Sequence, residues 1–424
     1  MIIFYRFFCV IFQSVRVFQK IPDNPCKVIK FIATFAKIDT QMNVEREIAG
    51  FALPFAAGVL ATAYAGAIFC GYSSYVHFIA LLGIFCPIML LLQRRIHDFR
   101  PYFIWSLIVV AALGCGMLSA TTAISLFDMQ QSALGIHCRK LGIAMQRLID
   151  TIPFASENTN SLTKALLTGE RADLSGHIKN AFRESGASHI LALSGLHLGI
   201  IYGILSKSLA LLGNSKKMRI LRSIIIICIC GIYTLSTGAG DSLVRALIFI
   251  ALREIAKVTC RYHGLGQILL VSLIIQLVLD PLAIRSISFQ LSYAAMAGIA
   301  FIYPWLQGFW NRASEFFQSN SSDRTASHLS GLVSYPGRWI WNTVALSIAC
   351  QLTTAPLAYI YFGTFPIHFM LTNLLTLPLT GLLIPTALAT ICLHALGYCP
   401  AFLIHTTEWM ASTLVRILEV ISTM

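Results

Sequence analysis

The chain has 424 residues, of which 57% are hydrophobic and only 12% are charged, and its mean hydropathy is +0.74. Soluble domains carry about 25% charged residues, and a soluble core of this length cannot hide so much apolar surface. The composition therefore excludes a soluble protein and predicts a polytopic membrane protein. The formal net charge of +13 is attributed mainly to Lys and Arg in cytoplasmic loops and less to a nucleic-acid surface.

Residues 1–41 are a basic N-terminal extension in which Lys and Arg are interleaved with Phe and Ile. One interpretation is a helix that lies on the membrane surface. The other, slightly favoured, is that translation starts at Met42 and that the preceding residues are not translated. A cleavable signal peptide is not expected, because no small-residue cleavage site follows the first apolar run.

Apolar stretches of about 20 residues predict membrane-spanning helices. Residues 242–258 are shorter and more polar, and are expected to form a half-helix or a full span that faces a polar path. The predicted fold is an all-α polytopic membrane helix bundle of about 10–11 transmembrane segments, some of them broken or half-helices. The expected spans are 48–70, 73–92, 101–124, 188–212, 219–237, 264–279, 287–308, 339–361, 366–397 (one long helix or two short ones) and 400–421.

Loop charges predict the orientation of these spans. The short loop 94–100 is basic and is expected to be cytoplasmic, which places the N-terminus inside and residues 125–187 outside. After the extension, the predicted organisation is a three-span membrane region at 42–124, an outer-face segment of amphipathic helices at 125–187, and a membrane core at 188–424. The expected location is the inner (plasma) membrane, crossed several times.

The stretch that begins at His189 places polar residues at the start of an apolar run, where they are costly. On one continuous helix Ser194 and His197 would share a face, and His189 would lie in the same sector. We interpret the three side chains as a polar lining at the mouth of a pore. One alternative is helix–helix packing, with Gly195 and Gly199 as a small-xxx-small pair. Another is a serine nucleophile with a histidine base, which lacks an acidic partner nearby.

Residues 236–246 contain a second polar group, in which two glycines are expected to interrupt the helix. Asp241 is expected to cap the next helix and to form an ion pair with Arg245, four residues later. A helix N-terminus inside the membrane attracts anions, so Arg245, with Arg253, predicts an element that contacts phosphate. The alternative is a structural ion pair that holds a re-entrant bend.

Two further polar groups lie near the ends of spans. Asp280-Pro281 is expected to end one helix, and Gln290 begins the next, where a structural role is favoured. Asn373 lies in a region whose prolines predict kinked or broken helices, at Pro356, Pro366, Pro378 and Pro385. The predicted translocation path is lined by His189, Ser194, His197, Asp241, Arg245, Arg253, Gln290 and Asn373.

The sequence contains no Walker phosphate loop, no His-Glu-x-x-His motif and no cluster of zinc ligands. The twelve cysteines lie mostly in apolar runs and include no Cys-x-x-Cys pair, so neither a metal site nor a disulfide framework is predicted. We therefore expect no catalytic residue, no cofactor and no enzyme activity.

Four segments, in order, resemble the membrane core of the ComEC-type competence family over about residues 160–385. They begin with Leu-Leu-Thr-Gly-Glu-Arg at 166–171 and Ala-Leu-Ser-Gly-Leu-His-Leu-Gly at 192–199, and continue through 237–293 and 351–378. The resemblance implies a channel that passes single-stranded DNA across the bacterial inner membrane during natural transformation. It also implies a separate DNA receptor, nuclease and cytoplasmic motor as partners, and leaves an assembly of several copies open.

The chain departs from many family members in two respects. Residues 125–160 are too short and too helical for an outer oligonucleotide-binding domain, and no metallo-β-lactamase-like domain follows the core up to Met424. We therefore do not expect nuclease activity. The alternative functions are a transporter of a small organic anion or lipid-linked solute built on the same core, and a non-functional fragment of a longer reading frame.

Overall fold

The protein was analysed as a computed structural model, which describes residues 37–68, 79–84, 101–121, 133–213, 215–259, 264–308, 324–362, 369–398 and 400–423. The chain divides into two compact units, Met1–Glu47 and Ile48–Met424. The two interpretations of the extension at 1–41 and most of the expected span 73–92 fall outside the described residues. Apart from the first residues of α3, the features below belong to the second unit.

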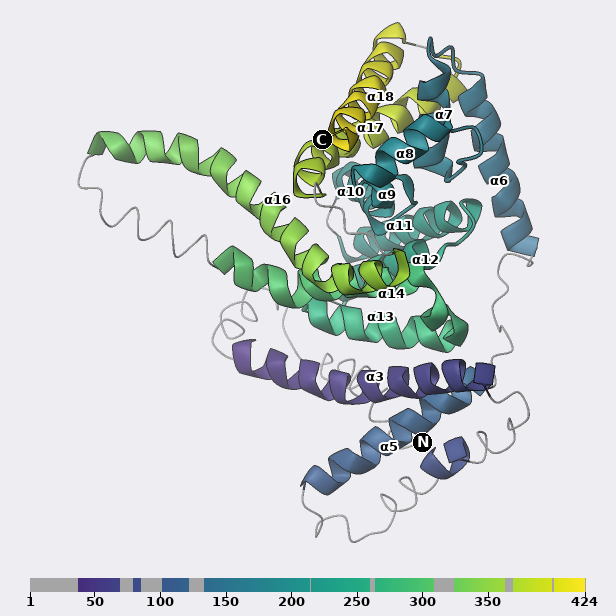
Figure 1. Ribbon diagram of the computed structural model, residues 1–424, viewed down its shortest axis with the longest axis vertical. Coiled ribbons are helices and arrows are strands. Elements are labelled where there is room, and N and C mark those ends of the chain that lie inside the picture. The colour runs from purple at the N-terminus through teal and green to yellow at the C-terminus, as the bar shows by residue number, and fades with distance from the viewer. Residues whose placement is uncertain are drawn as a thin grey trace. The chain divides into compact units, whose positions relative to one another are not determined.

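The secondary-structure elements that the structure describes are all helices, labelled in Figure 1. This is the all-α membrane helix bundle that the sequence predicts. The main elements are α3 (Lys37–Ile68), α5 (Pro101–Thr121), α6 (Ala133–Asp150), α7 (Glu157–Thr168), α8 (Gly176–Glu184), α9 (Ser188–Leu191), α10 (Gly195–Ser208), η3 (Leu209–Leu212), α11 (Lys216–Ser236), α12 (Asp241–Val258), α13 (Leu265–Leu279), η4 (Pro281–Arg285), α14 (Ile287–Ala297), the π-helical η5 (Gly298–Ile302), α16 (Arg324–Phe362), α17 (Phe369–Ala395) and α18 (Ala401–Ser422).

Five helices among the described residues are long and apolar enough to cross a membrane: Glu45–Ala63, Lys216–Ser236, Ile287–Gly308, Gly337–Phe362 and Phe369–Ala395. Each lies where the hydropathy predicts a span. Shorter apolar helices occupy three more of the expected positions, at Ser106–Met117, Gly195–Leu211 and Leu265–Leu279. Helix α13 ends at Leu279, as the following Asp-Pro pair predicts.

Two expected spans differ from the prediction. Helix α18 occupies the position of the span expected at 400–421, but it is not among the described helices that are long and apolar enough to cross a membrane. Residues 188–212 do not form one helix: α9 ends at Leu191, and Ser194 has extended backbone (φ −125°, ψ 171°) before α10 begins. The shared helical face expected for His189, Ser194 and His197 is therefore wrong.

The prolines expected to break helices do not do so where the structure describes them. Pro356 lies within α16, and Pro378 and Pro385 lie within one continuous α17, so the region 366–397 contains one long helix. Threonine hydroxyls donate to helix carbonyls nearby; Thr386 Oγ1, for example, donates to Leu382 O at 3.0 Å. Thr386 thus shares a carbonyl with the helix, whereas the carbonyl that Pro385 leaves without an N–H donor is that of Gly381, four residues before it.

Small residues bring membrane helices into close contact. A Cβ atom added to Gly58 of α3 would collide with the carbonyl oxygen of Leu113, and one added to Gly116 of α5 would collide with that of Phe55. Gly298 meets Ala349 O of α16 in the same way. Because lipid supplies no hydrophobic driving force between helices, such contacts hold them together through van der Waals packing.

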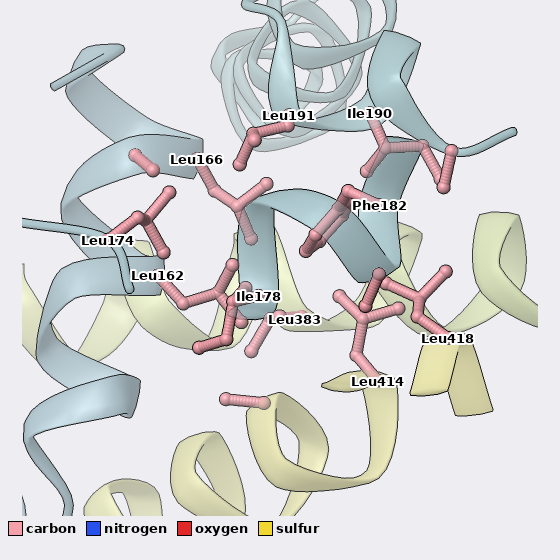
Figure 2. Close-up of a cluster of buried hydrophobic side chains, with 14 residues drawn as sticks. Leu162, Leu166, Leu174, Ile178, Phe182, Ile190, Leu191, Leu383, Leu414 and Leu418 are labelled. Atoms are coloured by element: carbon pink, nitrogen blue, oxygen red, sulfur yellow. The ribbon is translucent and has the colours of Figure 1, made fainter. Parts of the chain in front are cut away.

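Helices α7, α8 and α9 pack against α17 and α18 through one apolar cluster. Figure 2 shows its side chains converging from the two groups of helices, with Phe182 and Ile178 on one side and Leu383 and Leu414 on the other. Phe182 is fully buried, so truncation to alanine would cost about 3–5 kcal/mol. The segment that the sequence assigns to the outer face is thus anchored on the C-terminal helices of the same compact unit.

Lys164 connects the helices of this segment outside the apolar cluster. Its Nζ lies 2.6 Å from Asp150 Oδ1 and 2.7 Å from Asp173 Oδ2. The hydrogen bonds to Asp150 and then Asp173 raise the pKa of Lys164 above its usual value, against an opposing effect of burial. The interaction joins the end of α6, α7 and the turn that precedes α8.

Candidate functional site

The N-terminus of α10 is closed by a reciprocal pair of hydrogen bonds. Ser194 Oγ accepts from the backbone N–H of Leu196 at 3.2 Å, and His197 Nδ1 accepts from the backbone N–H of Ser194 at 3.3 Å. Since Nδ1 is an acceptor, a neutral His197 carries its proton on Nε2. His197 is 0% exposed, and its Nε2 has no hydrogen-bond partner among the described residues.

The first residue of α10 lies against the side of α12. A Cβ added to Gly195 would lie 3.2 Å from a terminal nitrogen (Nη2) of Arg245 and 3.4 Å from Cβ of Ala246. The same test at Gly199 finds no described atom within 4 Å. The close helix contact is therefore at Gly195, and the expected pairing with Gly199 is wrong. A Cβ at 195 would require the guanidinium to shift by a few tenths of an ångström.

Arg245 is the buried cation of this site, with 7% of its surface exposed. Its Nη1 donates to the backbone carbonyl of Ser292 at 3.1 Å, and its guanidinium carbon lies 5.9 Å from the ring centroid of Tyr293. Its Nε has no partner among the described residues. Within that part of the chain no carboxylate lies within 4.0 Å of the guanidinium.

The ion pair expected between Asp241 and Arg245 is therefore not formed. Asp241 is the first residue of α12, and the N-cap is Gly240, so the expected capping role is also wrong. The local spacing would allow the pair, but Arg245 instead reaches the carbonyl and ring that α14 presents to it. Asp241 adds a negative charge to the first turn of α12 and partly offsets the positive end of that helix.

A chain of hydrogen bonds links α12, α13 and α14 around Arg245. Tyr293 donates its hydroxyl to Gln276 Oε1 at 3.1 Å, and Gln276 Nε2 donates to the backbone carbonyl of Asp241 at 3.3 Å. The hydroxyls of Ser242 and Ser288 lie 3.1 Å apart. The Arg245 guanidinium is thus held in place by three helices and the start of a fourth.

This arrangement has the chemistry of an anion site. A helix N-terminus carries about half a positive charge, and the N-terminus of α10 lies beside a guanidinium with no carboxylate partner. Buried cations are stable when an opposite charge or an anionic ligand compensates them. Among the described residues, no group of three His, Cys, Asp or Glu side chains could hold a metal ion.

The other predicted path residues make hydrogen bonds or ring contacts with residues other than Arg245. His189 Nδ1 donates to Gly186 O at 3.2 Å, and Arg253 is exposed, 5.9 Å from the ring of Tyr202. Gln290 accepts from the Tyr361 hydroxyl at 2.8 Å and donates to the carbonyl of Ile284. Asn373 Nδ2 donates to Ser347 at 3.3 Å, while its Oδ1 is buried without a partner in the described ranges.

Sequence reasoning assigned no role to a second buried charge on α12. Glu254 is 2% exposed and accepts hydrogen bonds from the hydroxyls of Tyr202 and Ser223, both at 2.8 Å. Lys257 Nζ lies 2.6 Å from Glu254 Oε1. A carboxylate in an apolar stretch was the available signal, but its partners are 52 and 31 residues away in the sequence.

Comparison with known proteins identifies a family for this chain. A family model described as "Competence protein" matches residues 166–424, more than half of the chain. The "Uncharacterized protein YcaI" of Escherichia coli is 26% identical over 243 residues, which cover 56% of this chain and 30% of that protein. The "ComE operon protein 3" of Bacillus subtilis is 23% identical over 241 residues, or 57% of this chain and 27% of that protein.

The chain thus spans about three tenths of the length of these curated relatives. No solved structure matches it. The matched region 166–424 includes α10, α12 and α14, which carry the buried Arg245 site. The chain belongs to the competence protein family.

Proposed function

We propose that this protein forms the membrane path through which single-stranded DNA crosses the bacterial inner membrane during natural transformation. Membership of the competence protein family supports this, as does the resemblance of its four segments to the ComEC-type core. The apolar helices support a multi-pass membrane location. The basic loop 94–100 supports a cytoplasmic N-terminus.

The observation that carries the proposal is the environment of Arg245. Arg245 lies in the second turn of α12, and charged side chains within apolar segments of membrane proteins are costly and commonly functional. Arg245 is buried with no carboxylate within reach among the described residues. It also lies beside the positive end of α10. Such a site favours an anion, and a phosphodiester backbone supplies one at every nucleotide.

The proposal assigns no bond-breaking step to this chain. Capture of DNA at the cell surface, degradation of the second strand and the pulling force come from separate partners: a receptor, a nuclease and a cytoplasmic motor. Path residues on several helices, including Gln290 on α14 and Asn373 on α17, would then line a wet route between these helices. Several copies of the chain, surrounded by membrane lipid, could build this route together.

A transporter of a small organic anion or lipid-linked solute is the second candidate. The same unpaired guanidinium supports it, because any anion of suitable size would be attracted. The size of the cargo distinguishes the two, since a DNA strand presents many phosphates along the route and a small solute presents one. The test below separates them by following labelled DNA.

The test is complementation of a strain from which the gene has been deleted. Surface-bound and cytoplasmic labelled DNA are measured separately for wild type, Arg245→Met and Arg183→Gln. Arg183 is an exposed cation of α8 that has no described contact with Arg245, and serves as the matched control. Membrane levels of each variant are measured in parallel. Wild type and Arg183→Gln are expected to restore cytoplasmic label.

Arg245→Met is expected to retain surface label and to lose cytoplasmic label by 100-fold or more, on the order of 2.7 kcal/mol. Cytoplasmic DNA at the wild-type level in a well-inserted Arg245→Met protein would remove Arg245 from the path. Unchanged uptake in the deletion strain itself, in a genome without a second full-length homologue, would favour the small-solute transporter.

A further inference from the structure

A second polar region lies at the opposite end of α12. A pocket of about 430 Å³ opens there between η3, α11 and α12. The charged groups that line it are Arg219 and Arg222 of α11 and Glu254 and Lys257 of α12. Lys257 follows Arg245 by twelve residues, which is about 18 Å along a helix. The pocket is therefore separate from the Arg245 site.

The charges in this pocket do not cancel. Glu254 is occupied by Lys257 and by the hydroxyls of Tyr202 and Ser223. Arg222 forms no hydrogen bond or ion pair with any described residue. Two arginines thus remain uncompensated by carboxylate in the wall of the pocket.

Arg219 is also incompletely paired. One of its terminal nitrogens (Nη2) donates to the backbone carbonyl of Val258 at 3.4 Å, while its Nε is buried and lacks a partner in the described ranges. A buried guanidinium nitrogen without an acceptor loses the hydrogen bonds it would make to water. An anionic oxygen in the pocket would accept a hydrogen bond from Arg219 Nε and could pair with Arg222 at the same time.

The outer surface beside the pocket is apolar. Leu211 of η3 is 90% exposed, Ile224 of α11 is 54% exposed and Ile255 of α12 is 53% exposed. Helix α11 is apolar and long enough to span a membrane, so these side chains match hydrocarbon. A ligand that combines an anionic head with apolar chains would satisfy both surfaces.

We propose that this pocket binds the phosphate headgroup of an anionic phospholipid, with the acyl chains lying over the exposed apolar residues of η3, α11 and α12. Basic pockets between membrane helices bind acidic lipid headgroups in this way. The inference does not depend on what the protein transports.

The test uses the purified full chain in a neutral detergent. Native mass spectrometry measures the affinity for phosphatidylglycerol and for phosphatidylcholine, and thermal unfolding measures the stabilisation that each lipid gives. Inorganic phosphate and a short thymidine oligonucleotide are tested in the same way. The variants are Arg222→Gln, Arg222→Lys and Lys217→Gln. Lys217 is an exposed cation of α11 outside the pocket lining and is the matched control.

The proposal predicts that phosphatidylglycerol binds more tightly than phosphatidylcholine to wild type and to Lys217→Gln. In Arg222→Gln the affinity for phosphatidylglycerol should fall about fivefold, the effect of one Lys or Arg near a charged membrane surface, and Arg222→Lys should regain most of it. Equal affinities for phosphatidylglycerol in Arg222→Gln and Lys217→Gln would overturn the proposal.

The two other sources of phosphate give distinct results. If inorganic phosphate alone stabilised wild type as much as phosphatidylglycerol does, and lost this effect in Arg222→Gln, the pocket would be a site for free phosphate. If the oligonucleotide stabilised wild type as much as phosphatidylglycerol does, and lost this effect in Arg222→Gln, the pocket would be part of the DNA path. Either result would contradict the lipid assignment.

Discussion

One charged side chain is buried near each end of α12, and the two differ in whether the protein compensates the charge. Glu254 is surrounded by Lys257 and two hydroxyls, all within 2.8 Å of its carboxylate oxygens. Arg245, buried to a similar degree, has one backbone carbonyl and an aromatic ring, and no carboxylate within the described chain. The charge of Glu254 is compensated within the protein. The charge of Arg245 is not, and an anionic ligand can compensate it.

The contrast indicates different roles for the two residues. A paired and hydrogen-bonded buried charge holds helices together and becomes costly when one partner is removed. An uncompensated buried charge in a membrane protein is retained at a cost and points to function. We therefore expect stability to depend on Glu254 and transport to depend on Arg245.

The largest loss of stability is expected for Glu254→Met. The substitution leaves Lys257 and two hydroxyls, of Tyr202 and Ser223, without their shared acceptor. Because Lys257 is 41% exposed, the loss comes mainly from the two hydroxyls, at about 1–3 kcal/mol for each donor left without an acceptor. Thermal unfolding of the purified protein in detergent measures the effect. The double variant Glu254→Met/Lys257→Met should recover part of the loss, and equal melting temperatures for wild type and Glu254→Met would contradict a structural role.

A smaller loss is expected when a side chain is introduced at the start of α10. Gly195→Leu forces its side chain against Arg245 and Ala246, and such overpacking costs about 1–3 kcal/mol. Gly199→Leu is the matched control, because a Cβ there meets no described atom within 4 Å. Thermal unfolding and DNA uptake should both fall in the first variant and stay near wild type in the second. Equal melting temperatures and equal DNA uptake in the two variants would refute the close contact at Gly195.

Tyr293→Phe tests the hydrogen-bond chain behind Arg245. It removes the hydroxyl that donates to Gln276 but keeps the ring near the guanidinium, so the expected loss of stability is about 1 kcal/mol. Tyr359→Phe, at an exposed position of α16, is the control. If Tyr293→Phe lost no more stability than the control, the hydrogen bond from Tyr293 to Gln276 would contribute nothing to stability.

The smallest change in stability is expected for Arg245→Met, despite its burial. The lost hydrogen bond to Ser292 contributes about 1 kcal/mol, and removal of an uncompensated buried charge offsets it. The melting temperature should therefore stay close to wild type. A loss as large as that of Glu254→Met would mean that Arg245 is a structural residue, and the contrast between the two ends of α12 would fail.

Much of the helical framework could be predicted from the sequence. Helix α13 follows Gly264 and ends before Asp280-Pro281, and hydropathy located it within one residue at its start. The break before α10 was not foreseen, because Ala192–Ser194 contains neither Gly nor Pro. Its signal was a capping box with His197 in place of the usual acidic or amide residue.

The contacts of the candidate site were less predictable. Arg245 was singled out as a charge in an apolar segment, and the structure shows it buried, but its partner was inferred from helical spacing. Local spacing shows which residues can meet on one helix, whereas the position of Ser292 and Tyr293 on α14 depends on how two helices pack. The partners of Glu254, on α10 and α11, were hidden for the same reason.

The most direct test of the proposed path is a photo-crosslink to DNA in transit. A photo-activatable side chain replaces Ser242, which lies in the first turn of α12 beside Ser288, in a chain that still supports uptake. A second variant carries the photo-activatable side chain at Ile229, an exposed apolar position on α11. The account predicts adducts with labelled transforming DNA from position 242 and not from position 229. Active uptake with no adduct at position 242, or with equal adducts at both positions, would contradict a DNA path beside Arg245.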